Sequence, residues 1–490
     1  MSIANTALYT AGQVRRLDRL AIERFGIADS ELMERAGRAA FRQMRVSWPE
    51  ARRVLVCCGS GNNGGDGYVI ARLCAEAGLT VRVLATRPPE ALSGAARVAA
   101  ERWSGSVCSE ADPADFDVVV DALLGSGLAR ELDGPIAALV GRLNEVTRQG
   151  SPGVLAVDVP TGLNADTGMP MGNAVRADLT VTFIARKRGL YTGHAAEFRG
   201  HLVYRDLQVP AAVFDELAPD ARLLDASALA ACLQPRPAAA HKGRFGRVLV
   251  IGGDYGYPGA CVLSARAALV GGAGLVSVAT RERHAWALAA ALPEAMWADA
   301  EAPGMLDTLF DQATVLAVGP GLGRSTWSQR LFERAIADPR PMVLDADGLN
   351  LLADRPIARG NWVLTPHPGE AGRLLGVSTA QVQRDRFASA RELASRYAAT
   401  VVLKGAGTVV ASPEGAASVC AHGTPAMAGA GMGDALTGLV AALIAQGFGL
   451  HEAAELGVLV HALAGERAAA GRRCILAGEL IDTIGPVMGR

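Results

Sequence analysis

Short apolar runs alternate with helix-like segments along most of the chain, and this alternation limits the possible folds more than any other feature. Strands separated by helices are typical of βαβ units, in which the strands are parallel and helices cover the sheet. Residues 11–44 also carry a helical pattern, which breaks at Gly26 and predicts two helices. In the first part of the chain the runs are VLVCC at 54–58, TVRVLAT at 80–86, DVVVDALL at 117–124, VLAVDVP at 154–160 and LTVTFIA at 179–185.

A second series of the same kind follows and ends in a helical stretch at 433–470. Between the two series, residues 208–246 are rich in prolines and small residues, which is typical of a connecting segment. We therefore predict two tandem α/β domains of three αβα layers, residues 1–225 and 226–490. The runs of the second series are RVLVIGG at 247–253, GLVSVAT at 274–280, TVLAVGPGLG at 314–323, PMVLDADG at 341–348, NWVLTPHPGE at 361–370 and TVVLKGAGTVV at 400–410.

Charge and composition exclude several function classes. The 490 residues include 48 Lys and Arg against 49 Asp and Glu, a formal net charge of −1, so we expect no nucleic-acid partner. The N-terminus has no apolar signal segment, and the longest uncharged stretch, 435–450, contains three glycines, so we expect a cytoplasmic protein without a membrane span. The eight cysteines show no CxxC spacing and are expected to be reduced core residues.

The stretch GSGNNGGDG at 59–67 lies between an apolar run and a helical pattern. Its first six residues fit GxGxxG, which suits close approach of a phosphate to the backbone, although the motif alone is weak. An ordinary NAD-binding site would have an acidic residue at the end of the next strand, where this chain has Arg87 and Pro88. A tight turn without a ligand is the competing interpretation.

Polar side chains in this loop and at two later strand ends favour a binding site over a turn. Asn62, Asn63 and Asp66 offer oxygen and amide groups to a polar ligand or a hard cation. Asp121 and Asp158 end two of the apolar runs and are followed by turns rich in Gly or Thr. Because the carboxyl ends of parallel strands meet in one crevice, we expect these side chains to gather there.

These motifs, together with GIADSELMERAGRAA at 26–40, resemble the NAD(P)H-hydrate epimerase family over residues 10–220. The resemblance implies a Rossmann-like domain that interconverts the R and S forms of NAD(P)H hydrated at C6 of the nicotinamide ring. It places Asp158 at the reacting ring, either to relay protons or to orient the ligand. It assigns a K⁺ ion to Asn63, Asp121 and Thr161. The residues it assigns to the hydrated dinucleotide are Asn62, Asn63, Gly64, Gly65, Asp66, Gly125, Ser126, Gly127, Leu128, Ala129, Arg130 and Glu131.

The second half carries a glycine-rich helix entry, GAGMGD at 429–434, before the apolar helical stretch 435–445. Backbone N–H groups at such a helix start stabilise a phosphoryl group, and Asp434 is suited to take a proton from an attacking hydroxyl. Lys404 precedes a glycine-rich turn suited to covering nucleotide phosphates, and no GxxxxGK[ST] occurs in the chain. A plain glycine-rich helix entry is the alternative.

The ending GAGMGD resembles the ribokinase-like superfamily. With TPHPGE, VGPGLG, LDADGLNLL and HKGRFGRVLVIGG it resembles the ADP-dependent NAD(P)H-hydrate dehydratases over residues 235–485. The resemblance implies an enzyme that phosphorylates the C6 hydroxyl of the S hydrate and then eliminates phosphate. The phosphoryl donor would be ADP, or ATP as an alternative. The resemblance makes Asp434 the general base. It assigns the hydrate to Ala260, Gly321 or Gly323, His367 and Asp434, and the nucleotide to Lys404, Gly405, Ala406, Gly407, Thr408 and Gly433.

Several further residues carry weaker expectations. Glu370 and Asp347 either organise Mg²⁺ around the phosphates or are structural carboxylates. Met432 stands where a small or hydroxyl residue is expected beside the phosphoryl path. The run 384–386 is expected on a solvated helix face. The side chains of Trp286, Trp297 and Trp327 are expected to pack within the protein.

Two functions remain open from the sequence. The first is a bifunctional repair enzyme with small-molecule partners only, the dinucleotide hydrate and an adenine nucleotide, and the family resemblance implies a homo-oligomer. The second is a ribokinase-like small-molecule kinase fused to a non-catalytic nucleotide-binding module.

Overall fold

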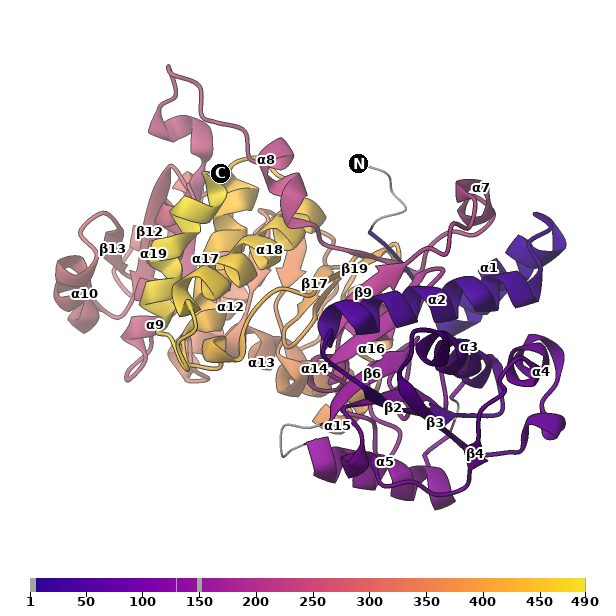
Figure 1. The fold of residues 1–490 in the computed structure, drawn as a ribbon. Helices are drawn as coiled ribbons and strands as arrows, with labels where there is room; N and C mark the ends of the chain where they lie inside the picture. Colours follow the sequence, from indigo (N-terminus) through magenta and orange to yellow (C-terminus); the bar gives the residue numbers. More distant parts are fainter. Residues whose placement is uncertain (1–5, 129, 148–151, 490) are drawn as a thin grey trace. The chain divides into compact units, whose positions relative to one another are not determined.

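The computed structural model describes residues 6–128, 130–147 and 152–489 (Figure 1). The chain divides into two compact units, Met1–Arg222 and Leu223–Arg490. None of the helices in these described stretches combines the length and the apolar character that a membrane span needs.

The first unit contains a parallel sheet of seven strands in the order β4-β3-β2-β5-β6-β7-β9. All five predicted runs are strands of this sheet, which confirms the predicted parallel α/β fold. The sequence missed β4, which has two residues, and β9, which lies at the sheet edge. The strands are β2 (Arg53–Cys58), β3 (Thr80–Ala85), β4 (Val107–Cys108), β5 (Val118–Ala122), β6 (Gly153–Val157), β7 (Leu179–Phe183) and β9 (His201–Arg205).

Helices cover both faces of this sheet. Residues of α2, α3 and α4 share one apolar core with Val54, Val56 and Val120. Leu55 and Val119, which alternate with those residues along the strands, pack with α5 on the other face. The two predicted N-terminal helices are confirmed as α1 and α2. The helices are α1 (Ala11–Glu23), α2 (Asp29–Ser47), α3 (Asn62–Glu76), α4 (Gly94–Glu101), α5 (Gly134–Thr147), α6 (Ala195–Phe198) and α7 (Ala211–Phe214), and the short strands are β1 (Ala7–Tyr9), β8 (Arg186–Lys187) and β10 (Ala221–Leu223).

The glycine-rich stretch forms the start of a helix rather than a loop. The sequence predicted that helical structure begins after Gly67, but α3 begins at Asn62. A Cβ atom at Gly64 would lie 2.0 Å from the carbonyl oxygen of Gly59, and one at Gly65 would lie 2.5 Å from Met33 Sδ. These glycines therefore let α3 pack closely on its neighbours, and this packing outweighs the low helix propensity of glycine.

The sheet strands of the second unit follow the order β13-β12-β11-β14-β15-β16-β17-β18-β19. Those from β13 to β17 are parallel, and the last two are antiparallel. All six predicted runs contain strands, and 400–410 forms two of them. The strands are β11 (Arg247–Ile251), β12 (Leu275–Thr280), β13 (Met296–Asp299), β14 (Val315–Val318), β15 (Met342–Leu344), β16 (Trp362–Leu364), β17 (Thr400–Leu403), β18 (Thr408–Ala411) and β19 (Ala417–Cys420).

One face of this sheet packs against α9, α17, α18 and α19 through a large apolar core (Figure 1). The predicted helical stretch 433–470 is two helices, because α17 ends at Ala445 and α18 begins at Leu450. Gly447 and Gly449 lie in the connection and explain the break. The helices are α8 (Leu229–Cys232), α9 (Pro258–Val270), α10 (Ala285–Ala291), α11 (Met305–Gln312), α12 (Thr326–Ile336), α13 (Ala346–Asp354), α14 (Pro368–Leu375), α15 (Thr379–Arg384), α16 (Arg386–Tyr397), α17 (Met432–Ala445), α18 (Leu450–Ala469) and α19 (Ala477–Met488).

Candidate active sites

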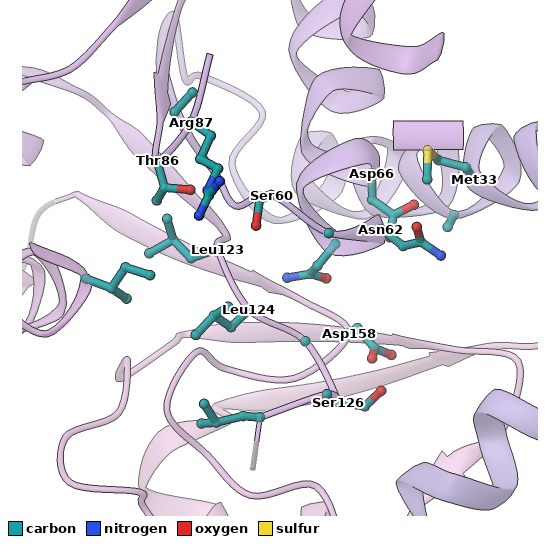
Figure 2. Close-up of a pocket in the computed structure, with 18 of the residues that line it drawn as sticks. Met33, Ser60, Asn62, Asp66, Thr86, Arg87, Leu123, Leu124, Ser126 and Asp158 are labelled. Atoms are coloured by element: carbon teal, nitrogen blue, oxygen red, sulfur yellow. The ribbon is translucent and has the colours of Figure 1, made fainter. Parts of the chain in front are cut away.

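The first unit contains a cavity of about 1270 Å³ at the carboxyl ends of its strands (Figure 2). The cavity lies where the strand order reverses, between β2 and β5. Ligands of open α/β sheets bind at this point, because the loops after the two strands diverge there. The cavity is large enough for an entire dinucleotide.

Most residues expected to contact the dinucleotide line this cavity. Gly64 and Gly65 do not, since they are buried in the packing of α3. Ala129 falls outside the described residues. The expected residues that line the cavity are Asn62, Asn63, Asp66, Gly125, Ser126, Gly127, Leu128, Arg130, Glu131 and Asp158.

Asp158 forms an ion pair that the sequence did not predict. Its backbone has a φ of 65°, a left-handed conformation that is uncommon outside glycine. Its carboxylate contacts the ammonium group of Lys187, which is 1% exposed. Lys187 also donates hydrogen bonds to Phe183 O at 2.9 Å and Thr182 Oγ1 at 3.1 Å. Both charged side chains line the cavity, so a ligand there meets an oriented acid–base pair.

Two of the other carboxyl groups that line the cavity, Asp66 and Asp18, have raised pKa values. Burial, and then the charge of Asp158, raises the pKa of Asp66 well above its usual value. Burial, and then Asp29, raises the pKa of Asp18 on α1 to about 6. Asp18 was missed because the sequence shows it only as one polar position of an amphipathic helix.

The three residues assigned to K⁺ lie near the cavity. Asp121 is fully buried and accepts hydrogen bonds from Thr161 Oγ1 at 2.6 Å and Thr161 N at 2.8 Å. Burial raises its pKa to about 6. The side-chain amide of Asn63 is buried, and neither its nitrogen nor its oxygen has a hydrogen-bond partner. A buried carboxylate and an unsatisfied amide oxygen fit a monovalent cation.

A buried ion pair forms the centre of the second candidate site. Lys404 Nζ, at the end of β17, donates to Asp345 Oδ1 at 2.7 Å. Thr437 Oγ1 on α17 donates to the other oxygen of Asp345 at 2.9 Å. Although burial alone would raise it, the pKa of Asp345 is held below its usual value by Lys404 and Thr437. A Cβ at Gly433 would lie 3.0 Å from Lys404 Nζ, so the helix start is adjacent to this pair.

Asp434 lies in the first turn of α17, beside the helix N-terminus. The helix begins after Gly431, which has a φ of 86°, and Ser264 Oγ donates to Asp434 O at 2.7 Å. Burial, and then the negative charge of Asp345, raises the pKa of Asp434 to about 7, against the effect of Lys404. A carboxylate with this pKa is suited to general-base catalysis at neutral pH, and the free N–H groups beside it favour an anion.

The side chain of Met432 is buried in the apolar core, and its carbonyl oxygen is 3.0 Å from His461 Nε2. Burial lowers the pKa of His461 to about 4, so a neutral imidazole donates this bond and anchors the first turn of α17. The methionine at position 432, where a small or hydroxyl residue was expected, therefore contributes to the packing of the apolar core.

The start of α14 brings its N-cap residue His367 and its first-turn residue Glu370 to the ion pair. Lys404 N donates to Pro366 O at 2.9 Å, and Lys404 Nζ is 4.0 Å from Glu370 Oε2. The half-exposed imidazole of His367 caps α14 by accepting from Gly369 N at 2.9 Å. Its Nε2, which lies 3.4 Å from Glu370 Oε1, is therefore the ring nitrogen that carries a proton. Burial raises the pKa of Glu370 to about 7.

The loop after β14 brings together the remaining residues assigned to the hydrate. A Cβ at Gly321 would lie 3.2 Å from the Cβ of Ala260, and one at Gly323 would lie 3.1 Å from Asp254 Oδ2. Asp347 Oδ2 accepts from Gly323 N at 2.8 Å, and its other oxygen accepts from Asn350 at 3.2 Å. These hydrogen bonds favour a structural role for Asp347 over a role in Mg²⁺ binding.

The turn 405–408 joins β17 to β18 next to Lys404 and contains the other residues assigned to the nucleotide. Arg386 lies beneath it, although the sequence predicted that 384–386 lies on a solvated face. Arg386 is 1% exposed and donates to the carbonyl oxygens of Leu403 at 3.0 Å and Lys404 at 3.1 Å. It therefore fixes the backbone from which the turn departs. The neighbouring residues in the sequence predict neither the burial of Arg386 nor its hydrogen-bond partners.

Two other expectations of packing were partly wrong. Trp327 is buried as expected, but Trp286 on α10 is 88% exposed. Cys57, Cys58, Cys74, Cys261 and Cys420 are buried free thiols, whereas Cys474 is exposed.

Two family models match the chain, one in each unit. A model described as YjeF-related protein N-terminus matches residues 29–189. A model described as NAD(P)H-hydrate dehydratase matches residues 248–486.

Relatives that match over nearly the whole chain span both units. The bifunctional NAD(P)H-hydrate repair enzyme Nnr of Coxiella burnetii is 47% identical over 482 residues, which covers 97% of this chain and 98% of that protein. The protein of the same name from Escherichia coli is 41% identical over 491 residues, which covers 99% of this chain and 94% of that protein.

Two solved structures match the second part of the chain. A ribokinase-like superfamily protein from Enterococcus faecalis has a TM-score of 0.52 and 28% identity, covering 55% of this chain and 96% of its own. The ADP/ATP-dependent NAD(P)H-hydrate dehydratase of Bacillus subtilis, co-crystallized with ATP/Mg²⁺, has a TM-score of 0.50 and 29% identity. The match covers 55% of this chain and 98% of that chain.

Proposed function

The chain belongs to the family of bifunctional NAD(P)H-hydrate repair enzymes, and from this premise we propose that each unit performs one repair reaction at the site described above. The enzyme epimerises the R and S hydrates of NAD(P)H, and it dehydrates the S form with ADP, which yields AMP and phosphate. The observation that carries this function is the 47% identity over 97% of the chain, because it spans both units.

In the dehydration, we propose Asp434 as the general base. Its carboxylate takes the proton of the C6 hydroxyl while the hydroxyl oxygen attacks the terminal phosphoryl group of ADP and AMP leaves. The C6–O bond of the new phosphate ester then breaks as the N1 lone pair moves toward C6. Loss of a proton from C5 completes the double bond of NAD(P)H. Hydroxide is a poor leaving group and phosphate a good one, so the nucleotide makes the elimination possible.

Lys404 and the backbone N–H groups at Gly433 are suited to hold the transferred phosphoryl group. The turn 405–408 is proposed to cover the rest of the nucleotide, and Ala260, Gly321, Gly323 and His367 to bind the hydrate. Among the described residues, no three His, Cys, Asp or Glu side chains gather to hold a metal ion alone. Mg²⁺ commonly binds through one or two carboxylates plus phosphate oxygens, so we propose that Glu370 and the nucleotide phosphates would hold it, and that it would neutralise phosphate charge there.

In the epimerisation, we propose that Asp158 moves the proton of the C6 hydroxyl. Removal of this proton lets the C6–N1 bond break to give an aldehyde, while N1 takes up a proton. Reclosure on the opposite face of the aldehyde returns the other epimer with no net change in atoms. The Lys187 ammonium holds the Asp158 carboxylate in place and is the nearby acid for N1.

We propose that Asn63, Asp121 and Thr161 hold K⁺. A cation would compensate the buried carboxylate and satisfy the Asn63 oxygen. We expect K⁺ to raise the unfolding temperature of the enzyme more than Li⁺ at equal ionic strength, and Asn63→Ala to remove the difference. Equal unfolding temperatures of the wild type in the two salts would contradict the assignment.

A homo-oligomer and a cytoplasmic location stay predictions from the sequence. Light scattering of the purified chain and fractionation of the cells that produce it test them.

The products of the second unit test the proposed function against the kinase alternative. We expect purified enzyme with S hydrate and ADP to form AMP, phosphate and NAD(P)H in equal amounts, as measured by chromatography. A stable phosphorylated hydrate without NAD(P)H would instead support a small-molecule kinase.

A further inference from the structure

Arg87 lies at the carboxyl end of β3 and lines the cavity of the first unit. Figure 2 shows its guanidinium group directed toward Ser60, at the end of the cavity away from Asp158. The side chain is exposed, and within the described parts of the chain it takes part in no hydrogen bond or ion pair. An unpaired guanidinium at the wall of a ligand cavity is a ready binding group for an anion.

The strand order indicates which part of a dinucleotide reaches Arg87. The order β4-β3-β2-β5-β6 has the pattern 3-2-1-4-5 of dinucleotide-binding sheets. In that arrangement the pyrophosphate lies at the helix after the first strand, which here is the start of α3. One half of the ligand then extends toward the fourth and fifth strands, where Asp158 follows β6 and pairs with Lys187. The adenosine half extends toward the second strand, which here is β3.

The chemistry at the end of β3 suits a phosphate better than a hydroxyl. A carboxylate at this position accepts hydrogen bonds from an unmodified ribose, but β3 is followed by Thr86, Arg87 and Pro88. A guanidinium group has five N–H donors and no acceptor, and it forms paired hydrogen bonds with a phosphate monoester. Glu110, which follows β4 one strand further out, also lines the cavity, and its negative charge would disfavour a phosphate placed beyond Arg87.

We propose that Arg87 forms a 2′-phosphate subsite, so that the first unit prefers the hydrate of NADPH over that of NADH. The inference rests on the proposed epimerase function of this cavity and adds the form of substrate that it selects.

The test compares the two hydrates in the full chain. Pure R hydrate of NADPH or NADH is incubated without ADP, which leaves the dehydratase unit idle, and chromatography follows the R and S diastereomers. We expect Arg87→Gln to raise KM for NADPH hydrate about tenfold to a hundredfold, the effect of one charge-assisted contact. KM for NADH hydrate and kcat for both should be unchanged. Arg82→Gln removes the same charge from the exposed, cavity-distant part of β3 and should change neither substrate.

Each outcome has one meaning. An equal rise in KM for both hydrates would place Arg87 at the pyrophosphate or the adenine ring and overturn the proposal, as would unchanged KM for both. Retained turnover of NADH hydrate shows that the variant is folded. If the wild type converts neither hydrate, the proposed epimerase function fails, and this result is distinct from a failure of the subsite.

Discussion

Asp434 acts as a base only while its carboxylate is ionised, so dehydration should depend on pH near neutrality. Because its pKa is raised to about 7, the ionised fraction falls as the pH falls below 7. We expect kcat/KM for dehydration to rise with pH through about 7 and then level off. A profile that is flat from pH 5 to pH 9 would remove Asp434 from the proton transfer.

Asp345 should tune this pH dependence. Burial is the first cause of the raised pKa of Asp434 and the charge of Asp345 is the second, so Asp345→Asn should shift the midpoint to lower pH. The change also leaves Lys404 without its buried partner, and breaking such a pair destabilises a protein by about 3–5 kcal/mol. The pH profile is therefore measured below the unfolding temperature of the variant. A midpoint that stays in place or moves upward would contradict the account.

Arg386 should affect nucleotide binding without taking part in the chemistry. Removal of its hydrogen bonds to the carbonyl groups of Leu403 and Lys404 frees the turn that covers the phosphates. We expect Arg386→Met to raise KM for ADP about tenfold to a hundredfold, with a smaller effect on kcat and none on epimerisation. Arg384→Met, a matched loss of charge at an exposed position, should leave KM unchanged. A general loss of both activities would indicate a structural role only.

At the residue scale, the sequence identified the groups that lie in local motifs and missed those that act through distant partners. Asp434 stands out because a glycine-rich stretch precedes it, and Lys404 because a glycine-rich turn follows it. Lys187, Asp345 and Arg386 do not, since their importance comes from contacts 29, 59 and 17 residues away. The run of charged residues therefore led to a predicted solvated face for Arg386, whereas two backbone carbonyl oxygens accept its hydrogen bonds in the interior.

At the element scale, the start of α3 should be sensitive to added atoms. A Cβ at Gly64 would meet the Gly59 carbonyl at 2.0 Å, so Gly64→Ala requires a backbone shift. We expect a loss of about 1–3 kcal/mol in the free energy of unfolding of the first unit, measured by urea denaturation. Gly61→Ala should be nearly neutral, because a Cβ there meets nothing within 4 Å. Equal stability of the two variants would contradict the packing role of Gly64.

The apolar runs were correctly predicted as strands from the sequence, whereas β4, β9, β13 and β19 were not predicted. β4 has two residues, too few for an alternating pattern to appear. The glycine-rich start of α3 was also missed, because local propensity disfavours a helix where tertiary packing forms one. Both failures reflect contacts between elements rather than properties of single segments.

At the scale of the whole molecule, the two reactions should be separable. We expect Asp158→Ala to stop epimerisation while the dehydratase unit still consumes S hydrate at the normal rate. Asp434→Ala should do the reverse, because the two residues lie in different compact units. Chromatography of the two hydrates and of NADH measures both activities in each variant. Loss of both activities in either variant would show that the units do not act independently.

If one chain repairs both hydrate epimers, a mixture of R and S NADH hydrate should be converted completely to NADH. The test is the absorbance of NADH after the wild-type enzyme is mixed with ADP and such a mixture. We expect full recovery of NADH, beyond the S fraction and faster than spontaneous epimerisation. Recovery that stops at the S fraction would contradict catalysis by the first unit, and no recovery would contradict the function of the second.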